Sequence, residues 1–319
     1  RVSDRDIPLL KGDHMTLPTL DEIVLGTLDF FAKEAPPVFD ISKFSLPLVV
    51  GSGNAMHTGK ILFSKQAAIS ADESSFRTVI SSYASVIEKG LITDAVVISS
   101  SGEKDSVWEI ELAKEKKLHT TLLTCKPQSS AAKLADVVYA YKSIAEPYTY
   151  NTSTYLGMIL STTGEKAAEI KTFIDQLAIA PGFDDYLSYA FILPDEYGNV
   201  APMIEIKRDE LFGPHVMVRA VTQSHARHAK FVHPWEKELV ITLGSENTFF
   251  GDPAHRWDIS LASQASFGTV IALTYYLCGL IQKAKPDYFM QHIEQFCNDY
   301  GPKAYGKPEK FDVIVPANE

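Results

Sequence analysis

Two short stretches of small residues follow apolar, β-branched segments and could bind an anion. Gly51-Ser52-Gly53-Asn54 comes after residues 46–50, and Ser99-Ser100-Ser101-Gly102 comes after residues 95–98. Each stretch is followed by helix-forming spacing, which is typical of a strand–loop–helix unit. Two such units side by side would direct helix N-termini, backbone amides and serine hydroxyls to one place. This combination favours phosphate binding.

Both loops have other interpretations. A dinucleotide site would need Gly-x-Gly-x-x-Gly, but Met56 occupies the third glycine position, while Asp72 lies at about the right distance for a carboxylate that binds ribose. The glycine loop could instead be a tight turn, and the serine loop could merely cap a helix. A nicotinamide-dependent oxidoreductase is therefore one alternative.

Length, charge and cysteine content limit the function classes. The 319 residues suffice for two domains, and 45% hydrophobic with 22% charged residues is typical of a globular protein. The net charge of −10, without a basic stripe, argues against a nucleic-acid partner. The 3 cysteines lack metal-ligand spacing, so we expect a reduced, cytoplasmic protein without metal or cofactor. No signal-peptide core is evident, and the longest apolar run, residues 270–281, favours a buried helix over a membrane anchor.

Strands and helices alternate along the first half and again along the second. We expect strands at residues 46–50, 67–70, 95–98, 119–123, 137–140, 188–193, 239–244 and 311–315. We expect helices at residues 20–33, 55–65, 79–89, 107–117, 129–134, 155–161, 166–177, 263–283 and 287–297, and helical material from 195 to about 230. This alternation implies parallel sheets covered on both faces, with the two loops at one carboxyl edge.

The pair of loops resembles the phosphosugar-binding motifs of the sugar isomerase (SIS) domain family, whose members include glucosamine-6-phosphate synthase and bifunctional phosphoglucose/phosphomannose isomerases. Residues 71–76 and 150–155 resemble the family's flanking segments. The resemblance implies two flavodoxin-like three-layer α/β/α domains with parallel sheets: an N-terminal extension at 1–19, a first domain at 20–160 and a second at 161–319. It also implies a homodimer that binds a phosphorylated sugar and has no membrane partner.

The resemblance also assigns a set of phosphosugar-binding residues: Gly53, Asn54, Ser99, Ser101, Gly102, Lys104 and Thr152. Two positions depart from the family pattern, because Lys104 stands where Thr is common and Ala55 stands where Ser is frequent. Lys104 could replace a hydroxyl contact by a cationic one, or it could point to solvent.

An aldose–ketose isomerase moves a proton between C1 and C2 and needs a base, usually a glutamate that precedes a His-Ala pair in this family. Aligning the family pattern on His228-Ala229 places Gln223 at the base position, and an amide cannot accept that proton. The catalytic candidates are therefore Glu236, Glu238 and His228, with Glu205 as a further carboxylate. Without a base, the protein would bind a phosphosugar in a regulatory role.

Several polar residues of the second half have open roles. His225, His228 and His233 have spacing that suits a metal but lack a distinct carboxylate partner, and a solvated helix face explains them as well. Arg219 and Arg227 are alternative phosphate contacts. Residues 255–258 are expected to form a polar aromatic loop, which either covers a site or closes a domain.

Overall fold

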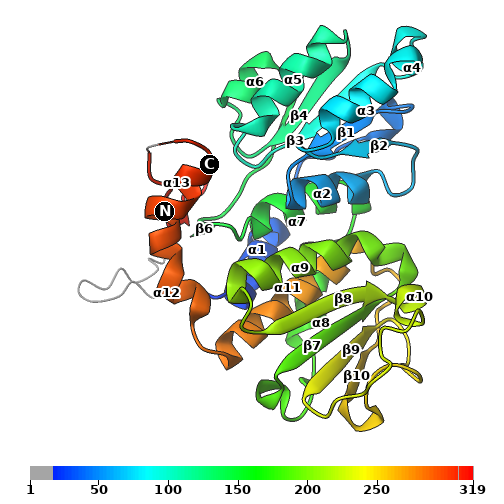
Figure 1. Cartoon of the computed structure of the whole chain (residues 1–319), viewed down its shortest axis with the longest axis vertical. Coiled ribbons are helices and arrows are strands. Elements are labelled where there is room, and N and C mark those ends of the chain that lie inside the picture. Colours follow the sequence, from blue (N-terminus) through cyan, green and yellow to red (C-terminus); the bar gives the residue numbers. More distant parts are fainter. Residues whose placement is uncertain (1–16, 308, 319) are drawn as a thin grey trace.

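Two parallel sheets organise the computed structural model, which describes residues 17–307 and 309–318 (Figure 1). The first sheet has the order β2-β1-β3-β4-β5, and the second has the order β10-β9-β7-β8. The strands of the first are β1 (Leu48–Gly51), β2 (Ile69–Ala71), β3 (Asp94–Ile98), β4 (His119–Thr124) and β5 (Val137–Ala140). Those of the second are β7 (Ser188–Leu193), β8 (Met217–Thr222), β9 (Glu238–Leu243) and β10 (Arg256–Ile259).

The first sheet has the strand order of flavodoxin-like folds. Counted from the opposite edge, the second sheet has the same order, β8-β7-β9-β10, but lacks a fifth strand. All strand pairs within both sheets are parallel. The predicted fold class is therefore confirmed. Of the predicted N-terminal extension, residues 1–16 lie outside the described residues.

A layer of helices lies between the two sheets, formed by α1 (Leu20–Lys33), α2 (Asn54–Leu62), α7 (Thr152–Thr163), α9 (Ala201–Phe212) and α11 (Phe267–Ala284) (Figure 1). The far face of the first sheet is covered by α3 (Phe76–Ser82), α4 (Ala84–Glu88), α5 (Asp105–Glu115) and α6 (Ser130–Leu134). The remaining helices are α8 (Ala167–Asp175), α10 (Gln223–Ala226), α12 (Tyr288–Gln295) and α13 (Gly301–Ala304). Among the described residues, no helix combines the length and apolar character that a membrane crossing requires.

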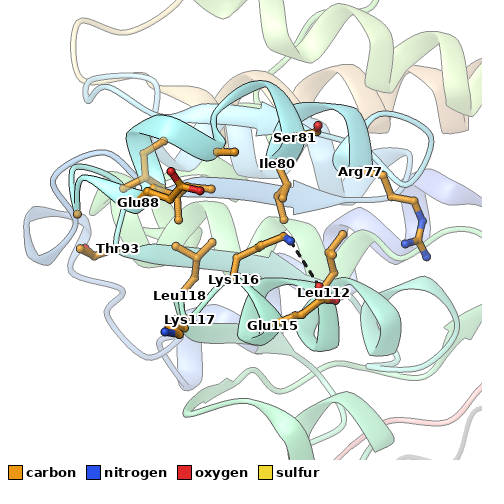
Figure 2. A pocket seen from close by; sticks show the side chains of 14 residues that line it. Arg77, Ile80, Ser81, Glu88, Thr93, Leu112, Glu115, Lys116, Lys117 and Leu118 are labelled. Atoms are coloured by element: carbon orange, nitrogen blue, oxygen red, sulfur yellow. Dashed lines mark hydrogen bonds and ion pairs between the residues drawn. The ribbon is translucent and has the colours of Figure 1, made fainter.

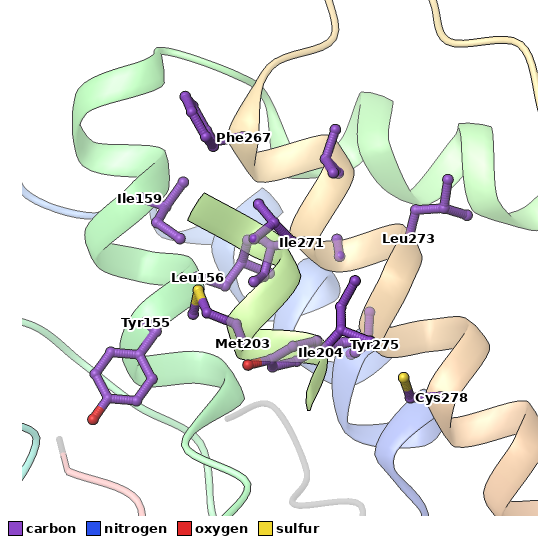
Figure 3. Close-up of a cluster of buried hydrophobic side chains, with 14 of the residues drawn as sticks. Tyr155, Leu156, Ile159, Met203, Ile204, Phe267, Ile271, Leu273, Tyr275 and Cys278 are labelled. Atoms are coloured by element: carbon purple, nitrogen blue, oxygen red, sulfur yellow. The ribbon is translucent and has the colours of Figure 1, made fainter. Parts of the chain in front are cut away.

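The main core lies in this central helical layer and against the inner faces of both sheets. Strand alternation divides the first sheet, since Val49 and Val96 face the main core whereas Val50 and Val97 face the core under α3 to α6. Figure 3 shows part of the main core, where side chains of α7, α9 and α11 pack together. The two halves therefore share one continuous apolar core.

Both ends of the chain cross between the halves. Helix α1 packs against α11, and a Cβ at Gly279 would lie 2.0 Å from the amide nitrogen of Asp21, so only glycine permits this approach. Near the C-terminus, β11 (Ile314–Val315) pairs antiparallel with β6 (Glu146–Pro147) of the first half. The proposed division at residue 160 falls inside α7 and stays a proposal.

The structure corrects three expectations for the second half. Residues 217–222 form β8 rather than helix, and residues 256–259 form β10 rather than a loop. The charged side chain of Arg219 in the middle of β8 hides the alternating strand pattern in the sequence. Strand β10 has no apolar pattern, because it is an edge strand with polar residues. The predicted last strand is shorter than expected and pairs with β6 instead of the second sheet.

Candidate functional site

The glycine and serine loops meet at the carboxyl edge of the first sheet. Strands β1 and β3 are parallel neighbours with Gly51 opposite Ile98, so both loops leave the sheet side by side. The Ser100 hydroxyl lies 3.1 Å from the Thr154 hydroxyl, which joins the serine loop to the first turn of α7. We call residues 53–54, 99–104 and 152 the anion cup. The structure thus places the two loops at one sheet edge, next to the start of α7, and binding of a phosphosugar by these residues stays a prediction.

Glycine is required at two positions of the anion cup. Gly102 has φ +63°, and a Cβ there would lie 2.0 Å from the Ser129 hydroxyl oxygen. Gly53 has φ +55° and open space around it, so its backbone conformation alone favours glycine. The two loops therefore have fixed shapes that other residues would strain.

The serine hydroxyls are oriented by amides of their own loop. Ser99 Oγ accepts a hydrogen bond of 3.1 Å from the Gly102 amide, and Ser101 Oγ accepts one of 3.3 Å from the Glu103 amide. The Gly102 amide is therefore used inside the loop, and the assignment of Gly102 to the phosphosugar site stays a prediction. A hydroxyl that accepts in this way keeps its own O–H to donate outward. The amides of Ser101 and Lys104 have no protein partner within the described residues.

Two buried polar atoms of the anion cup have no partner in the described part of the chain. Asn54 is 6% exposed and Thr152 is 3% exposed, and both Asn54 Oδ1 and Thr152 Oγ1 lack a hydrogen bond. A buried polar group without a partner costs about 1–3 kcal/mol. A polar ligand in the anion cup would remove that cost.

Lys104 is enclosed by aromatic rings. Its Nζ donates to Tyr148 Oη at 3.2 Å and lies 3.9 Å from the ring centroid of Tyr305 and 4.8 Å from that of Phe311. Burial, followed by the charge of Lys307, lowers the pKa of Lys104. No carboxylate lies within ion-pair distance of Lys104 among the described residues. Of the two alternatives for this side chain, pointing to bulk solvent is therefore wrong.

Lys207 and Glu210 form a half-buried ion pair on α9, and the sequence analysis identified neither of them. Lys207 Nζ lies 2.5 Å from Glu210 Oε2, and the two side chains are 0% and 23% exposed. Burial raises the pKa of Glu210, and the charge of Lys207 opposes that rise. Glu210 Oε1 accepts no hydrogen bond from any described residue. This oxygen is free to take a proton.

A strained turn connects this pair with the anion cup. Lys207 Nζ donates to the carbonyl oxygens of Thr149 and Tyr150, both at 2.8 Å. Thr149 has φ 77° and Asn151 has φ 47°. Positive φ is a genuine outlier for a β-branched residue. The next residue is Thr152 of the anion cup, so the turn holds Lys207 and Glu210 beside it.

A second buried glutamate, Glu146, has a structural role. Its carboxylate accepts from the Thr152 amide at 2.7 Å, the Ser153 amide at 3.2 Å and the Ser153 hydroxyl at 2.6 Å. It therefore caps the N-terminus of α7. Burial raises the pKa of Glu146, but both of its oxygens are occupied. Of the two glutamates, only Glu210 has a free oxygen.

The structure does not bring the predicted catalytic residues to the anion cup. Glu238 starts β9 at the amino edge of the second sheet, where it pairs with Arg219 at 2.6 Å and accepts from the Ser188 hydroxyl at 2.8 Å. Glu236 and His228 are exposed in the connection between α10 and β9. These three residues therefore lie away from the anion cup of the same chain, and their catalytic role stays a prediction.

The other candidate site residues of the second half lie outside the anion cup. Gln223 begins α10 and donates to the Ser245 hydroxyl, and Arg227 donates to Ser224 Oγ at 3.1 Å. Arg219 is engaged by Glu238 and is not a phosphate contact. No group of three or more His, Cys, Asp or Glu side chains in the described residues is arranged to hold a metal ion.

Asp72 is engaged in a turn after β2. Its Oδ1 accepts from the hydroxyls of Ser74 and Ser75 at 2.7 and 2.6 Å and from both of their amides. These hydrogen bonds lower the pKa of Asp72. The turn explains this aspartate without a ribose.

The sequence contained a signal for Glu210. It precedes His215 by the same spacing that separates Gln223 from His228, and it lies in a helix. This signal is incomplete, because Val216 follows His215, whereas the His-Ala pair of the family pattern occurs at His228-Ala229. The aromatic residues around Lys104 had no local signal.

A separate groove of about 670 Å³ lies at the amino edge of the first sheet, between α3–α4 and α5 (Figure 2). Its floor is apolar, with Ile80, Leu112 and Leu118, and charged side chains such as Glu88 and Lys117 lie at its rim. The groove lies at the opposite edge of the sheet from the anion cup, because Leu118 directly precedes β4. It is not part of the candidate site.

No family model and no curated protein matches the sequence. Solved structures do resemble the fold. The C-terminal domain of glucosamine-fructose-6-phosphate aminotransferase from Francisella tularensis has 14% identity and a TM-score of 0.56, over 83% of this chain and 93% of that one. Glucosamine-6-phosphate deaminase from Thermotoga maritima has 12% identity and a TM-score of 0.53, over 82% and 91%. Tagatose-6-phosphate ketose/aldose isomerase from Escherichia coli has 11% identity and a TM-score of 0.53, over 83% and 89%. The chain shares the fold of these proteins.

Proposed function

We propose that this chain is an SIS-type phosphosugar-binding protein and an aldose–ketose isomerase of a sugar phosphate. The proposal rests above all on Glu210, a half-buried carboxylate with a raised pKa and a free oxygen, whose partner Lys207 binds the carbonyls of Thr149 and Tyr150 just before Thr152 of the anion cup. The similar structures support the proposal, because they are enzymes named for sugar phosphates. That the two halves are a tandem of one domain type, and that two copies form a homodimer, belongs to the same proposal.

The anion cup would hold the phosphate. Ser99 and Ser101 have O–H groups free to donate, and the amides of Ser101 and Lys104 are available. Helices α2, α5 and α7 begin at the anion cup, and the positive ends of their dipoles would attract the phosphate. The Thr152 hydroxyl would donate to a phosphate oxygen, whereas Asn54 Oδ1 accepts only and would need a sugar hydroxyl as its donor. A phosphate there would fix the sugar with its carbonyl carbons away from the loops.

Glu210 would remove the proton from C2 of an aldose or C1 of a ketose and return it to the neighbouring carbon, while a second proton moves between the oxygens on C1 and C2. A base works best when its pKa is close to the working pH, and burial shifts Glu210 in that direction. Lys207 stabilises the ionised form of this glutamate and is itself held by the carbonyl oxygens of Thr149 and Tyr150. The strained turn at residues 149–151 fixes both groups relative to the phosphate.

The regulatory alternative loses its main support. It rests on an amide, Gln223, at the base position, whereas we propose a carboxylate, Glu210, as the base. The oxidoreductase alternative was based on Asp72, which is engaged in a turn.

Binding of sugar phosphates tests the first part of the proposal. Fructose 6-phosphate or glucosamine 6-phosphate at about a hundred times its dissociation constant should add roughly 2.7 kcal/mol to the free energy of unfolding. The double substitution Ser99→Ala with Ser101→Ala should abolish this gain while the protein stays folded. If dinucleotides stabilise the protein and a panel of sugar phosphates does not, the proposal fails.

A further inference from the structure

A second pocket lies at the carboxyl edge of the second sheet. It has a volume of about 640 Å³ and lies between the 3-10 helix η3 (Asp195–Val200), the start of α9, the end of β8 and α10. Pockets of roughly 300–1,000 Å³ hold small molecules, and parallel sheets bind ligands at this edge. The proposed isomerase does not use this pocket.

Polar side chains from three elements line this pocket and are free to bind a ligand. Asn199 belongs to η3, Glu205 to α9 and His225 to α10. Within the described residues, none of these three side chains makes a hydrogen bond to the protein. Such convergent groups suit a molecule that carries several hydroxyls.

The charge of the lining excludes a phosphate. Two carboxylates, Asp195 and Glu205, line the pocket, and none of the described lining residues is Lys or Arg. Hydrogen bonds from Ser224 lower the pKa of Asp195, which therefore stays ionised at neutral pH. Arg208 is bound to Asp209 at 2.9 Å and also interacts with the charge of Glu205. Arg227 donates to Ser224 Oγ at 3.1 Å and interacts with the charge of Asp195. The pocket therefore favours a cation.

This arrangement is the electrostatic opposite of the anion cup, although the two sheets share one strand order. Between the central strands of the second sheet the corresponding crevice is closed, since a Cβ at Gly244 would lie 3.1 Å from Pro194 Cγ and Gln223 bonds to Ser245. The open space lies instead between β7 and β8, where Asp195 and Glu205 replace amides and serine hydroxyls.

We propose that this pocket binds a small organic cation that carries several hydroxyl groups and no phosphate. The pocket is not isolated from the anion cup, because η3 packs against α2, and the N-terminus of α2 contributes Asn54 to the anion cup. Binding in the second pocket should therefore change the affinity of the anion cup for its ligand, by linkage between the two sites.

Three probes with one carbon skeleton separate the two sites: glucamine as a cationic polyol, sorbitol as a neutral one, and sorbitol 6-phosphate as an anionic one. Calorimetry on the full chain should show glucamine binding that Glu205→Gln weakens at least tenfold, with sorbitol weaker than glucamine. Ser99→Ala with Ser101→Ala should leave glucamine binding unchanged and abolish sorbitol 6-phosphate binding. Asn199→Ala provides a second variant if Glu205→Gln does not fold.

The proposal is overturned if glucamine does not bind, if sorbitol binds equally well, or if only the serine variant affects glucamine. Failure of sorbitol 6-phosphate to bind concerns the anion cup alone. The two proposals therefore fail separately.

Discussion

Lys104 and Gly53 have the same backbone conformation in neighbouring loops. Lys104 has φ 59° and ψ −124°, Gly53 has φ 55° and ψ −121°, and each is the N-cap residue of the helix that follows its loop. Glycine adopts this conformation freely, whereas a lysine Cβ makes it strained at a cost on the order of 1–3 kcal/mol. The anion cup therefore requires this geometry on both sides and retains it where the residue is not glycine.

The strain at Lys104 predicts a difference between two substitutions that both remove the ammonium. Lys104→Gly should be more stable than Lys104→Ala by about 1 kcal/mol, because only glycine relieves the positive φ. Both variants lose the contacts with Tyr148, Tyr305 and Phe311, so their comparison isolates the backbone. Urea denaturation measures the difference. Equal stabilities, or a more stable alanine variant, would show that Lys104 is not strained.

The unpartnered hydroxyl of Thr152 predicts opposite effects on stability and binding. Thr152→Val keeps the shape of the side chain and removes a buried oxygen without a hydrogen bond, so the free protein should be equally or slightly more stable. Affinity for a sugar phosphate should fall by about 1 kcal/mol or more, since the ligand loses a partner. Thermal unfolding with and without ligand measures both effects.

The neighbouring residue is the matched control for Thr152. Ser153→Ala removes a hydroxyl that donates to Glu146 at 2.6 Å, so it should destabilise the protein whether or not a ligand is present. If Thr152→Val instead lowers stability as Ser153→Ala does, and leaves affinity unchanged, Thr152 is a structural residue.

The anion cup could be predicted from the sequence because its parts are local. A strand, a loop of small residues and a helix follow one another within a few residues, and parallel neighbours place both loops at one edge. The surroundings of Lys104 could not be predicted, since Tyr305 and Phe311 lie far away in the sequence and reach it only through the return of the chain to β6. Glu210 could not be predicted from the His-Ala pair, because the pair at His228-Ala229 points to Gln223, and His215 is followed by Val216.

Substitution of Glu210, the proposed base, should abolish turnover and leave substrate binding unchanged. Glu210→Gln keeps size and hydrogen-bonding capacity but cannot take the C1/C2 proton, so kcat should fall by about 10²–10⁴ with little change in KM. Exchange of the substrate C1 or C2 hydrogen with deuterated water should stop in parallel. Proton NMR of the sugar phosphate measures both the exchange and the turnover.

Glu238→Gln is the control for the base. This substitution breaks a partly buried ion pair with Arg219, so it should lower stability while the folded fraction keeps its activity. Glu238 would be the base after all if Glu238→Gln abolishes exchange and Glu210→Gln does not.

Glu109 on α5 is a buried carboxyl group with an unpartnered oxygen. It is 1% exposed, Oε1 has no hydrogen bond within the described residues, and burial, followed by the charges of Asp105, Glu73 and Asp72, raises its pKa to about 8. The folded protein therefore keeps the proton up to about pH 8, whereas the unfolded chain releases it near the ordinary value of 4.5. Between these values the folded state binds more protons, so the free energy of unfolding falls as the pH rises.

Glu109→Gln should remove this part of the pH dependence. The glutamine cannot ionise, so the variant should gain stability over the wild type progressively from about pH 5 to pH 8, and the gain should level off above the raised pKa. Since one pKa unit corresponds to about 1.4 kcal/mol, the gain should reach several degrees in Tm. Asp40→Asn, at an exposed residue, is the control and should show no such trend. A constant difference between Glu109→Gln and the wild type across this range would mean that Glu109 is already ionised in the folded protein.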